Sequence, residues 1–82
     1  MRVSSHNDDP GQAEWVRLIG EGKIVNVFLD GMLLDECHTA DDEEGFAIIT
    51  RRDRHGNFVV KDGELLTLKV VGDIRIELRG AA

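Results

Sequence analysis

The sequence is poor in the residues that mark disulfide-stabilised, base-stacking and membrane-embedded proteins. Its 82 residues include one cysteine, one proline, three phenylalanines, one tryptophan and no tyrosine. A single cysteine excludes an intrachain disulfide and fits a reducing compartment, and so few aromatic residues disfavour a surface that stacks nucleobases. No apolar run approaches the roughly 20 residues of a transmembrane helix, and the polar stretch 1–12 has no apolar region typical of a signal peptide. We therefore expect a soluble, cytoplasmic protein with no membrane contact.

Charge and size narrow the class of partner. The chain carries 16 acidic and 10 basic residues, a net charge of −6, whereas proteins that coat nucleic acid usually have a basic surface. A domain this small buries little apolar surface and is often stabilised by a disulfide, a metal or a partner subunit. Because no disulfide or metal framework is visible, we expect a protein partner or self-association.

Two Asp-Gly pairs, each between short apolar runs, are the strongest local signals. Asp30-Gly31 and Asp62-Gly63 are typical of two-residue hairpin turns, whose central residues adopt positive φ. A two-residue turn at Asp30-Gly31 places Leu29 opposite Met32 and Phe28 opposite Leu33 on the two strands that it joins. Both faces of that hairpin are then apolar near its tip, so this end is either covered on both faces within the fold or meets a partner through one face, and we favour the partner contact. We interpret the second pair as the turn of an ordinary scaffold hairpin.

The sequence is compatible with a short helical turn after Pro10, and the part expected to fold predicts further short strands and no helix. For the last hairpin, a three-residue loop over 71–73 is favoured over a two-residue loop, because it joins Leu66, Leu68 and Val70 to an apolar face on 74–78. Residues 39–44 are expected to be an acidic loop, and the polar segment 1–13 a flexible N-terminal arm. The predicted fold is therefore a single all-β domain over residues 14–80, a small antiparallel barrel or sandwich of six or seven short strands joined by hairpins. Its expected strands cover 23–29, 32–37, 45–52, 57–61, 65–71 and 74–78, and residues 15–19 are expected to form a short first strand or a lead-in to it.

Three groups of residues are candidates for chemistry, and none predicts catalysis. Cys37 and His38 are adjacent on a strand, so their side chains point to opposite faces and cannot act as a nucleophile and its base. The acidic run lacks the ligand spacing of a calcium loop, which leaves a solvated loop or an acidic docking patch for a basic partner. The basic group is short and is best explained as a charge-balancing loop. The acidic patch consists of Asp41, Asp42, Glu43 and Glu44, and the basic group of Arg51, Arg52, Arg54 and His55.

Trp15 stands where the polar segment meets the first apolar run. Tryptophan is enriched at interface hot spots but is also commonly part of a core, and the core interpretation is favoured. We predict no catalytic residue, no metal site and no cofactor, and thus a protein that is not an enzyme. The candidate partner-binding residues are Phe28, Leu29, Met32, Leu33 and Trp15.

The order of motifs resembles that of small β-rich proteins encoded by bacteriophages and prophages. A strand ends in Asp30-Gly31, Cys37 precedes the acidic stretch 40–46, and a polar turn over 53–57 leads on to a closing Gly-x-Ile-x-Ile strand over 72–76. Such proteins are mostly uncharacterised, so the resemblance implies a phage context, in the host cytoplasm or the virion, and no activity or site residue.

These observations favour a non-enzymatic protein–protein interaction or assembly module, and the resemblance implies a phage-encoded structural protein. Two alternatives stay open. One is an acidic inhibitor of a host nucleic-acid-binding enzyme, based on the charge and the acidic patch. The other is an OB-like or SH3-like barrel that binds nucleic acid through Arg51, Arg52 and Arg54.

Overall fold

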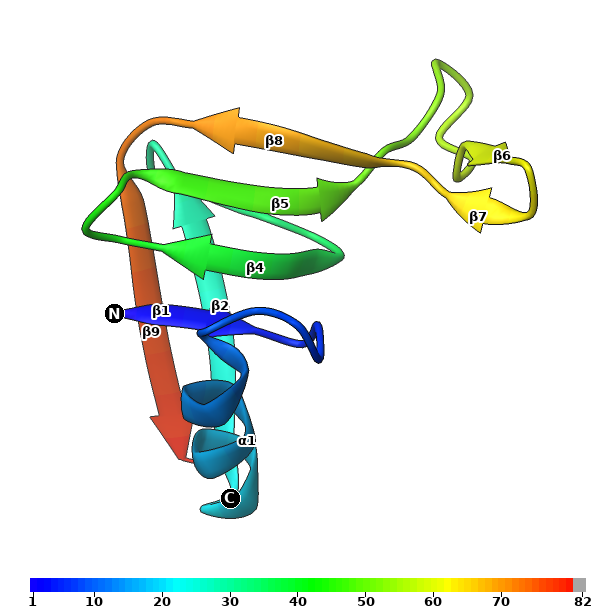
Figure 1. The fold of residues 1–82 in the computed structure, drawn as a ribbon. Helices are drawn as coiled ribbons and strands as arrows, with labels where there is room; N and C mark the ends of the chain where they lie inside the picture. Colours follow the sequence, from blue (N-terminus) through cyan, green and yellow to red (C-terminus); the bar gives the residue numbers. More distant parts are fainter. Residues whose placement is uncertain (81–82) are drawn as a thin grey trace.

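Two antiparallel sheets and one short helix build the fold, which the computed structural model describes for residues 1–80 (Figure 1). One sheet has the strand order β1-β4-β5-β8 and the other β3-β2-β9, while β6 and β7 pair only with each other. The chain is thus mostly β, as predicted, but its sheets are not closed into a barrel. The elements are β1 (Arg2–Ser4), α1 (Gln12–Gly20), β2 (Lys23–Leu29), β3 (Met32–Leu33), β4 (Cys37–Asp41), β5 (Phe46–Thr50), β6 (Val60–Lys61), β7 (Glu64–Leu65), β8 (Thr67–Val71) and β9 (Ile74–Gly80).

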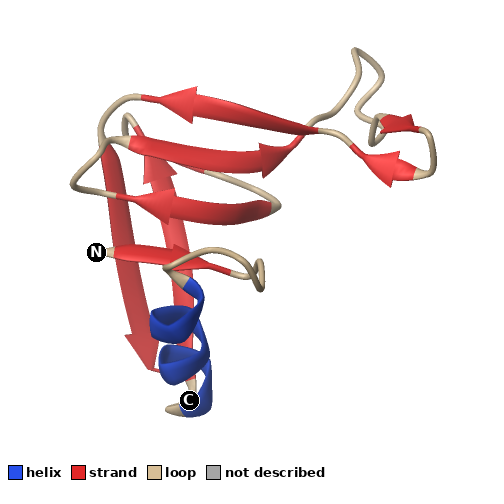
Figure 2. Ribbon diagram, viewed as in Figure 1, coloured by secondary structure: helices blue, strands red, loops and turns tan. Residues whose placement is uncertain are grey.

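The core lies between the two sheets, whose strands cross at a large angle in Figure 2. In the four-stranded sheet, the pairings of Val3 with Ala40 and of Ala40 with Ala47 place these side chains on one face. Both alanines are fully buried. That sheet contributes β-branched and leucine side chains from β2 and β9. The buried apolar residues are Val3, Leu18, Val27, Ala40, Ala47 and Ile74.

Both Asp-Gly turns form as predicted. Asp30 and Gly31 have φ values of 49° and 86°, and Leu29 pairs with Met32 and Phe28 with Leu33. Asp62 and Gly63 have φ values of 53° and 80° and connect β6 to β7. Positive φ at both central residues is the geometry that matches the twist of the flanking strands.

The strand predicted over 15–19 is wrong, because this segment is part of helix α1. Trp15 and Leu18, three residues apart, share the face that packs on the core. Val16 and Ile19 are also apolar but exposed, so the apolar residues of this short helix extend beyond the face that packs on the core and hide its period in the sequence. Arg17 forms ion pairs with Glu14 and, at 2.6 Å, with Glu21, which support the helix from its exposed face.

The segment predicted as a flexible arm over 1–13 contains strand β1 and the first residues of α1. Val3 and Ser4 are buried, and β1 pairs with β4 from Arg2 opposite Asp41 to Ser4 opposite Thr39. The hydroxyls of Ser4 and Thr39 lie 2.7 Å apart, which satisfies two buried polar groups at once. Backbone pairing, which does not depend on apolar composition, incorporates this segment into the sheet.

The predicted hairpin over 65–78 does not form. β8 pairs with β5, with Val70 opposite Ala47, whereas β9 pairs with β2, with Ile76 opposite Val27. The chain therefore turns a corner between the two sheets at Gly72-Asp73, and neither register considered for a local hairpin applies.

The acidic loop predicted over 39–44 begins later in the chain. Thr39, Ala40 and Asp41 belong to strand β4 and are buried. Only the residues that follow Asp41 form the turn to β5.

Candidate interaction surface

Residues 51–66, here called the projecting hairpin, extend away from the two sheets and carry β6 and β7 at their end (Figure 1). Backbone hydrogen bonds hold this segment together: the N–H of Arg51 donates to Leu66 O at 2.8 Å, and that of Leu66 donates to Val59 O at 2.9 Å. At the loop, Asp53 Oδ1 accepts the N–H of His55 at 2.8 Å and that of Asn57 at 3.1 Å. The projecting hairpin is therefore an ordered element in its own right.

One face of the projecting hairpin is apolar and exposed. Val60 lies opposite Leu65 and Arg52 opposite Phe58, and because Phe58 and Val60 are two residues apart their side chains share this face. Phe58, Val60 and Leu65 are 42%, 61% and 51% exposed. Arg52 covers the Phe58 ring, with its guanidinium carbon 4.4 Å from the ring centroid. This is the hairpin that the sequence predicted as ordinary scaffold, and the signal available for its apolar face was the pair of short apolar runs on either side of Asp62-Gly63.

A groove of about 300 Å³ runs between β3 and the base of the projecting hairpin. Its lining combines apolar side chains with the charged residues Asp35, Arg51 and Arg52. Arg52 belongs both to this lining and to the apolar face of the projecting hairpin, so the two surfaces adjoin. The groove is lined by Leu33, Leu34, Asp35, Ile49, Thr50, Arg51, Arg52 and Leu68.

Charge is divided unequally between the projecting hairpin and the rest of the chain. Residues 51–66 hold four basic and three acidic residues, whereas the remainder holds six basic and thirteen acidic ones. The projecting hairpin is net positive, and the rest of the chain carries all of the net negative charge.

Some of the predicted contact residues lie in the core and others on the surface. Four of them belong to the first hairpin, which is formed by β2 and β3, and the fifth is Trp15. Met32 and Leu33 are 74% and 57% exposed. Leu29 is half-buried and packs against the core. Phe28 lies on the outer face with Leu33, and the guanidinium carbon of Arg75 is 4.5 Å from its ring centroid. Trp15, on α1, packs against the core from one side.

The acidic patch is not a uniform surface. Asp41 is buried, and its Oδ1 accepts the N–H groups of Glu43 and Glu44 at 3.0 Å each. The hydrogen bond from Glu44, then that from Glu43 and the charge of Arg2, hold the pKa of Asp41 below its usual value. Asp41 therefore shapes the turn, and the exposed carboxylates of the patch are Asp42, Glu43 and Glu44.

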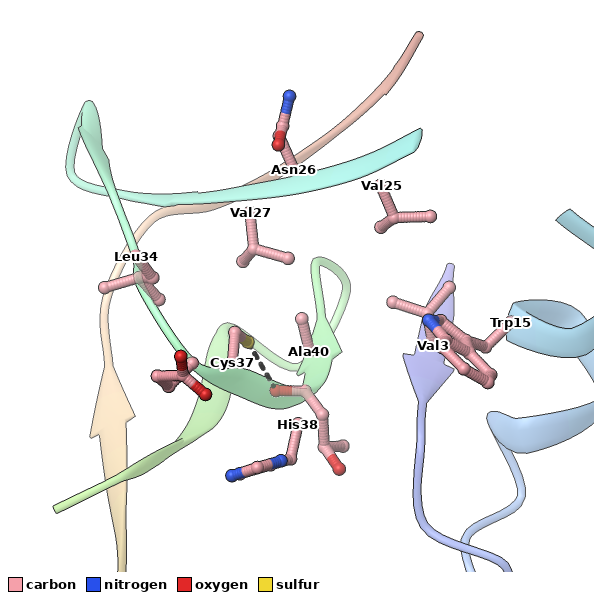
Figure 3. Close-up of a pocket in the computed structure, with 11 residues that line it drawn as sticks. Val3, Trp15, Val25, Asn26, Val27, Leu34, Cys37, His38 and Ala40 are labelled. Atoms are coloured by element: carbon pink, nitrogen blue, oxygen red, sulfur yellow. Dashed lines mark hydrogen bonds between the residues drawn. The ribbon is translucent and has the colours of Figure 1, made fainter. Parts of the chain in front are cut away.

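A second hollow, of about 270 Å³, lies between β2 and β4 beside Trp15 (Figure 3). The Cys37 thiol faces it and donates to Thr39 O at 3.3 Å, and burial raises the pKa of this thiol. His38 points the other way in Figure 3 and hydrogen-bonds the Thr50 hydroxyl. The two side chains diverge, as the alternation of a strand requires. Because the thiolate is the reactive form of cysteine, a raised pKa lowers the reactivity of this thiol.

Residues 1–80 contain no cluster of three or more histidine, cysteine, aspartate or glutamate side chains placed to hold a metal ion. Within the same range, no helix has the length and apolar character needed to cross a membrane.

Comparisons with models of protein families, with curated proteins and with solved structures gave no match to this chain. Its function is therefore argued from its own surface.

Proposed function

We propose that this protein is a non-enzymatic assembly module whose copies associate through the projecting hairpin. The exposed apolar face of Phe58, Val60 and Leu65 is the observation that carries the proposal. These three neighbouring apolar side chains lie on an ordered, protruding hairpin and do not pack into the core. Exposed apolar patches of this kind mark interaction sites. Association would also supply the stabilisation that an 82-residue domain without a disulfide otherwise lacks.

The first hairpin extends this surface. Leu33 lines the groove beside the projecting hairpin, and Met32 is exposed next to it. The partner-binding role expected for the tip of this hairpin is thus retained for Met32, Leu33 and Phe28. Leu29 and Trp15 are assigned to the core.

The experiment is light scattering coupled to size-exclusion chromatography of the full chain and of Leu65→Asp. We expect the wild type to elute with a mass above that of one chain and Leu65→Asp to elute as a monomer. Ile24→Asp is the matched control, because Ile24 is equally exposed but lies on β2. A monomeric wild type, or an equal loss of mass in Ile24→Asp, would contradict the proposal.

The two alternatives predict different results. An acidic inhibitor would be a monomer, and its binding to a basic host protein would weaken in salt and on neutralising Asp42, Glu43 and Glu44. A nucleic-acid-binding protein would retard an oligonucleotide in a gel at low salt and lose this on replacement of Arg51, Arg52 and Arg54. Either result together with a monomeric wild type would replace the assembly proposal.

A further inference from the structure

We infer that the hollow between β2 and β4 beside Trp15 is a binding site for a small amine with an apolar, aromatic body. The aromatic body lies at the Trp15 end of the hollow, and the ammonium group lies at Glu36. This site goes beyond the proposed function, because none of its lining residues belongs to the projecting hairpin.

The walls of the hollow come from both sheets and from α1. Val25 and Val27 are two residues apart on β2, so both side chains face the hollow (Figure 3). Trp15 lies at one end of the hollow in the figure, and Leu34 and Cys37 lie at the other. Trp15, Val25 and Leu34 are only half-buried, so an apolar occupant would remove more of their surface from water. A cavity of about 150 Å³ can hold benzene, and at about 270 Å³ this hollow has room for a phenyl ring with a short side chain.

A bulge in β4 turns both Cys37 and Ala40 toward the hollow. In a regular strand, residues three apart face opposite sides of the sheet. The register of β4 against β5 shifts between Cys37 and Thr39, and as a result Cys37 and Ala40 point to the same side in Figure 3. Bulges are frequent beside functional sites, where they redirect side chains. The irregular strand is therefore part of how this hollow is built.

Glu36, the residue before Cys37, supplies the charge at the end of the hollow away from Trp15. Its φ of 53° is one that glutamate rarely adopts. Its carbonyl accepts the N–H of Thr50 on β5 at 3.1 Å, which holds this backbone in place. Backbone in such rare conformations is concentrated at ligand sites.

Charge favours a cation over an anion as the ligand. The lining includes the Glu36 carboxylate and no lysine or arginine, and the chain carries a net charge of −6. The ring of His38 points away from the hollow in Figure 3. An ammonium group would pair with Glu36 through charge-assisted hydrogen bonds, and a phenyl group would pack against the Trp15 ring. A small arylalkyl amine therefore matches both ends of the hollow.

Titration of the full chain with phenethylamine, followed by the fluorescence of Trp15, tests the site. Trp15 is the only tryptophan in the chain, so its emission reports on this hollow. We expect a saturable change of emission. Phenethylamine should bind about two- to fivefold more tightly than phenethyl alcohol, the range that one exposed carboxylate supports. The anion hydrocinnamate should bind more weakly than the alcohol.

Two pairs of variants separate the charge from the cavity. Glu36→Gln removes the charge and should bind the amine and the alcohol equally. Asp35→Asn is its matched control, because Asp35 is the neighbouring exposed carboxylate and does not line the hollow; it should keep the preference for the amine. Cys37→Leu fills the hollow and should abolish binding, whereas Cys37→Ala leaves it open and should bind as the wild type does.

Several results would overturn the inference. They are a wild type whose emission shows no saturable response, binding that survives Cys37→Leu in a folded protein, and a preference for the amine that Asp35→Asn removes as fully as Glu36→Gln. If Cys37→Leu lacks the circular dichroism of the wild type, alkylation of the Cys37 thiol in the wild type takes its place. Saturating phenethylamine should slow this alkylation, and an unchanged rate would contradict the site. None of these results depends on the mass of the protein in solution, so the assembly proposal stands or falls separately.

Discussion

Asp30 and Asp73 are joined by two hydrogen bonds that link distant parts of the chain. The N–H of Asp30 donates to Asp73 O at 2.9 Å, and the N–H of Asp73 donates to Asp30 Oδ1 at 2.9 Å. The first residue of the β2–β3 turn thereby fixes the corner between β8 and β9. This contact holds the chain where it passes from one sheet to the other.

Replacing Asp30 should weaken the fold by removing this link. Asp30→Ala loses the carboxylate acceptor and places alanine at positive φ, so we expect a loss of about 1–3 kcal/mol in the free energy of unfolding. Asp30→Asn keeps an acceptor and tolerates positive φ, and should lose much less. Urea denaturation of the three proteins measures the difference, and equal stability of the alanine and asparagine variants would refute the role of the carboxylate.

A side chain at Gly72 should not fit the corner. A Cβ added there would lie 2.8 Å from Leu29 Cδ1 and 3.0 Å from the Asp30 carboxylate oxygens. We expect Gly72→Ala to destabilise the protein by about 1–3 kcal/mol, in the range of overpacking. Gly20→Ala is the control, because nothing lies within 4 Å of its added Cβ and a helical alanine should stabilise by up to about 1 kcal/mol. Thermal unfolding of both variants should shift in opposite directions; a shift in the same direction would contradict the packing described at Gly72.

Acid should remove a contribution to stability made by Asp9. The hydrogen-bonded ion pair with Arg2, at 2.8 Å, and the backbone N–H of Gly11 lower the pKa of Asp9 from 3.8 to about 2. A carboxyl whose pKa is depressed in the folded state stabilises that state above its unfolded pKa and loses this effect as the pH falls through its folded value. The free energy of unfolding should therefore be larger for the wild type than for Asp9→Asn at neutral pH. This difference should disappear as the pH falls from about 4 to about 2.

Urea denaturation of the wild type and of Asp9→Asn across this range of pH measures the gap. Asp8→Asn, in the same loop and exposed, serves as the control and should follow the wild type. A gap that stays constant from neutral pH to acid would show that the Arg2–Asp9 pair does not act through the charge of Asp9.

The two leucines of the first hairpin should respond differently to the same substitution. Leu29 packs against the core, so Leu29→Asp should cost about 2–5 kcal/mol by burying a carboxyl among apolar groups. Leu33 is exposed, and Leu33→Asp should change the stability of the single chain by no more than about 0.5 kcal/mol. Circular dichroism during chemical denaturation distinguishes them. Similar losses in both variants would mean that Leu33 is also a core residue.

Local signals in the sequence predicted local structure well. Positive φ at Asp30 and Asp62 and the pairing of Leu29 with Met32 follow from a two-residue turn and the period of a strand, which depend on neighbouring residues alone. The separation of β8 from β9 depends instead on Gly72 packing beneath Leu29, 43 residues earlier in the chain. Alternation over 65–78 is compatible with a hairpin and with a corner between two sheets, so the sequence could not distinguish them.

The candidate interaction surface was also predicted only in part, because some of it follows from local patterns and the rest from long-range arrangement. Met32 and Leu33 were expected at a contact because the first hairpin has too many apolar residues for one core face, and the structure leaves both exposed. The face of Phe58, Val60 and Leu65 depends on the projecting hairpin leaving the two sheets, which no local pattern encodes. The helix at Trp15 was missed because Val16 and Ile19, which are exposed, widen the run of apolar residues and hide the helical period.

Sedimentation equilibrium of the wild type and of Val60→Asp, from micromolar to millimolar concentration, tests the central claim most directly. Val16→Asp, which changes a similarly exposed valine on α1, is the control. We expect the wild type and Val16→Asp to pass from one chain to two as concentration rises, while Val60→Asp stays at the mass of one chain and remains folded. A wild type that sediments as a single chain throughout, or a Val60→Asp variant that dimerises as strongly as the wild type, would contradict it.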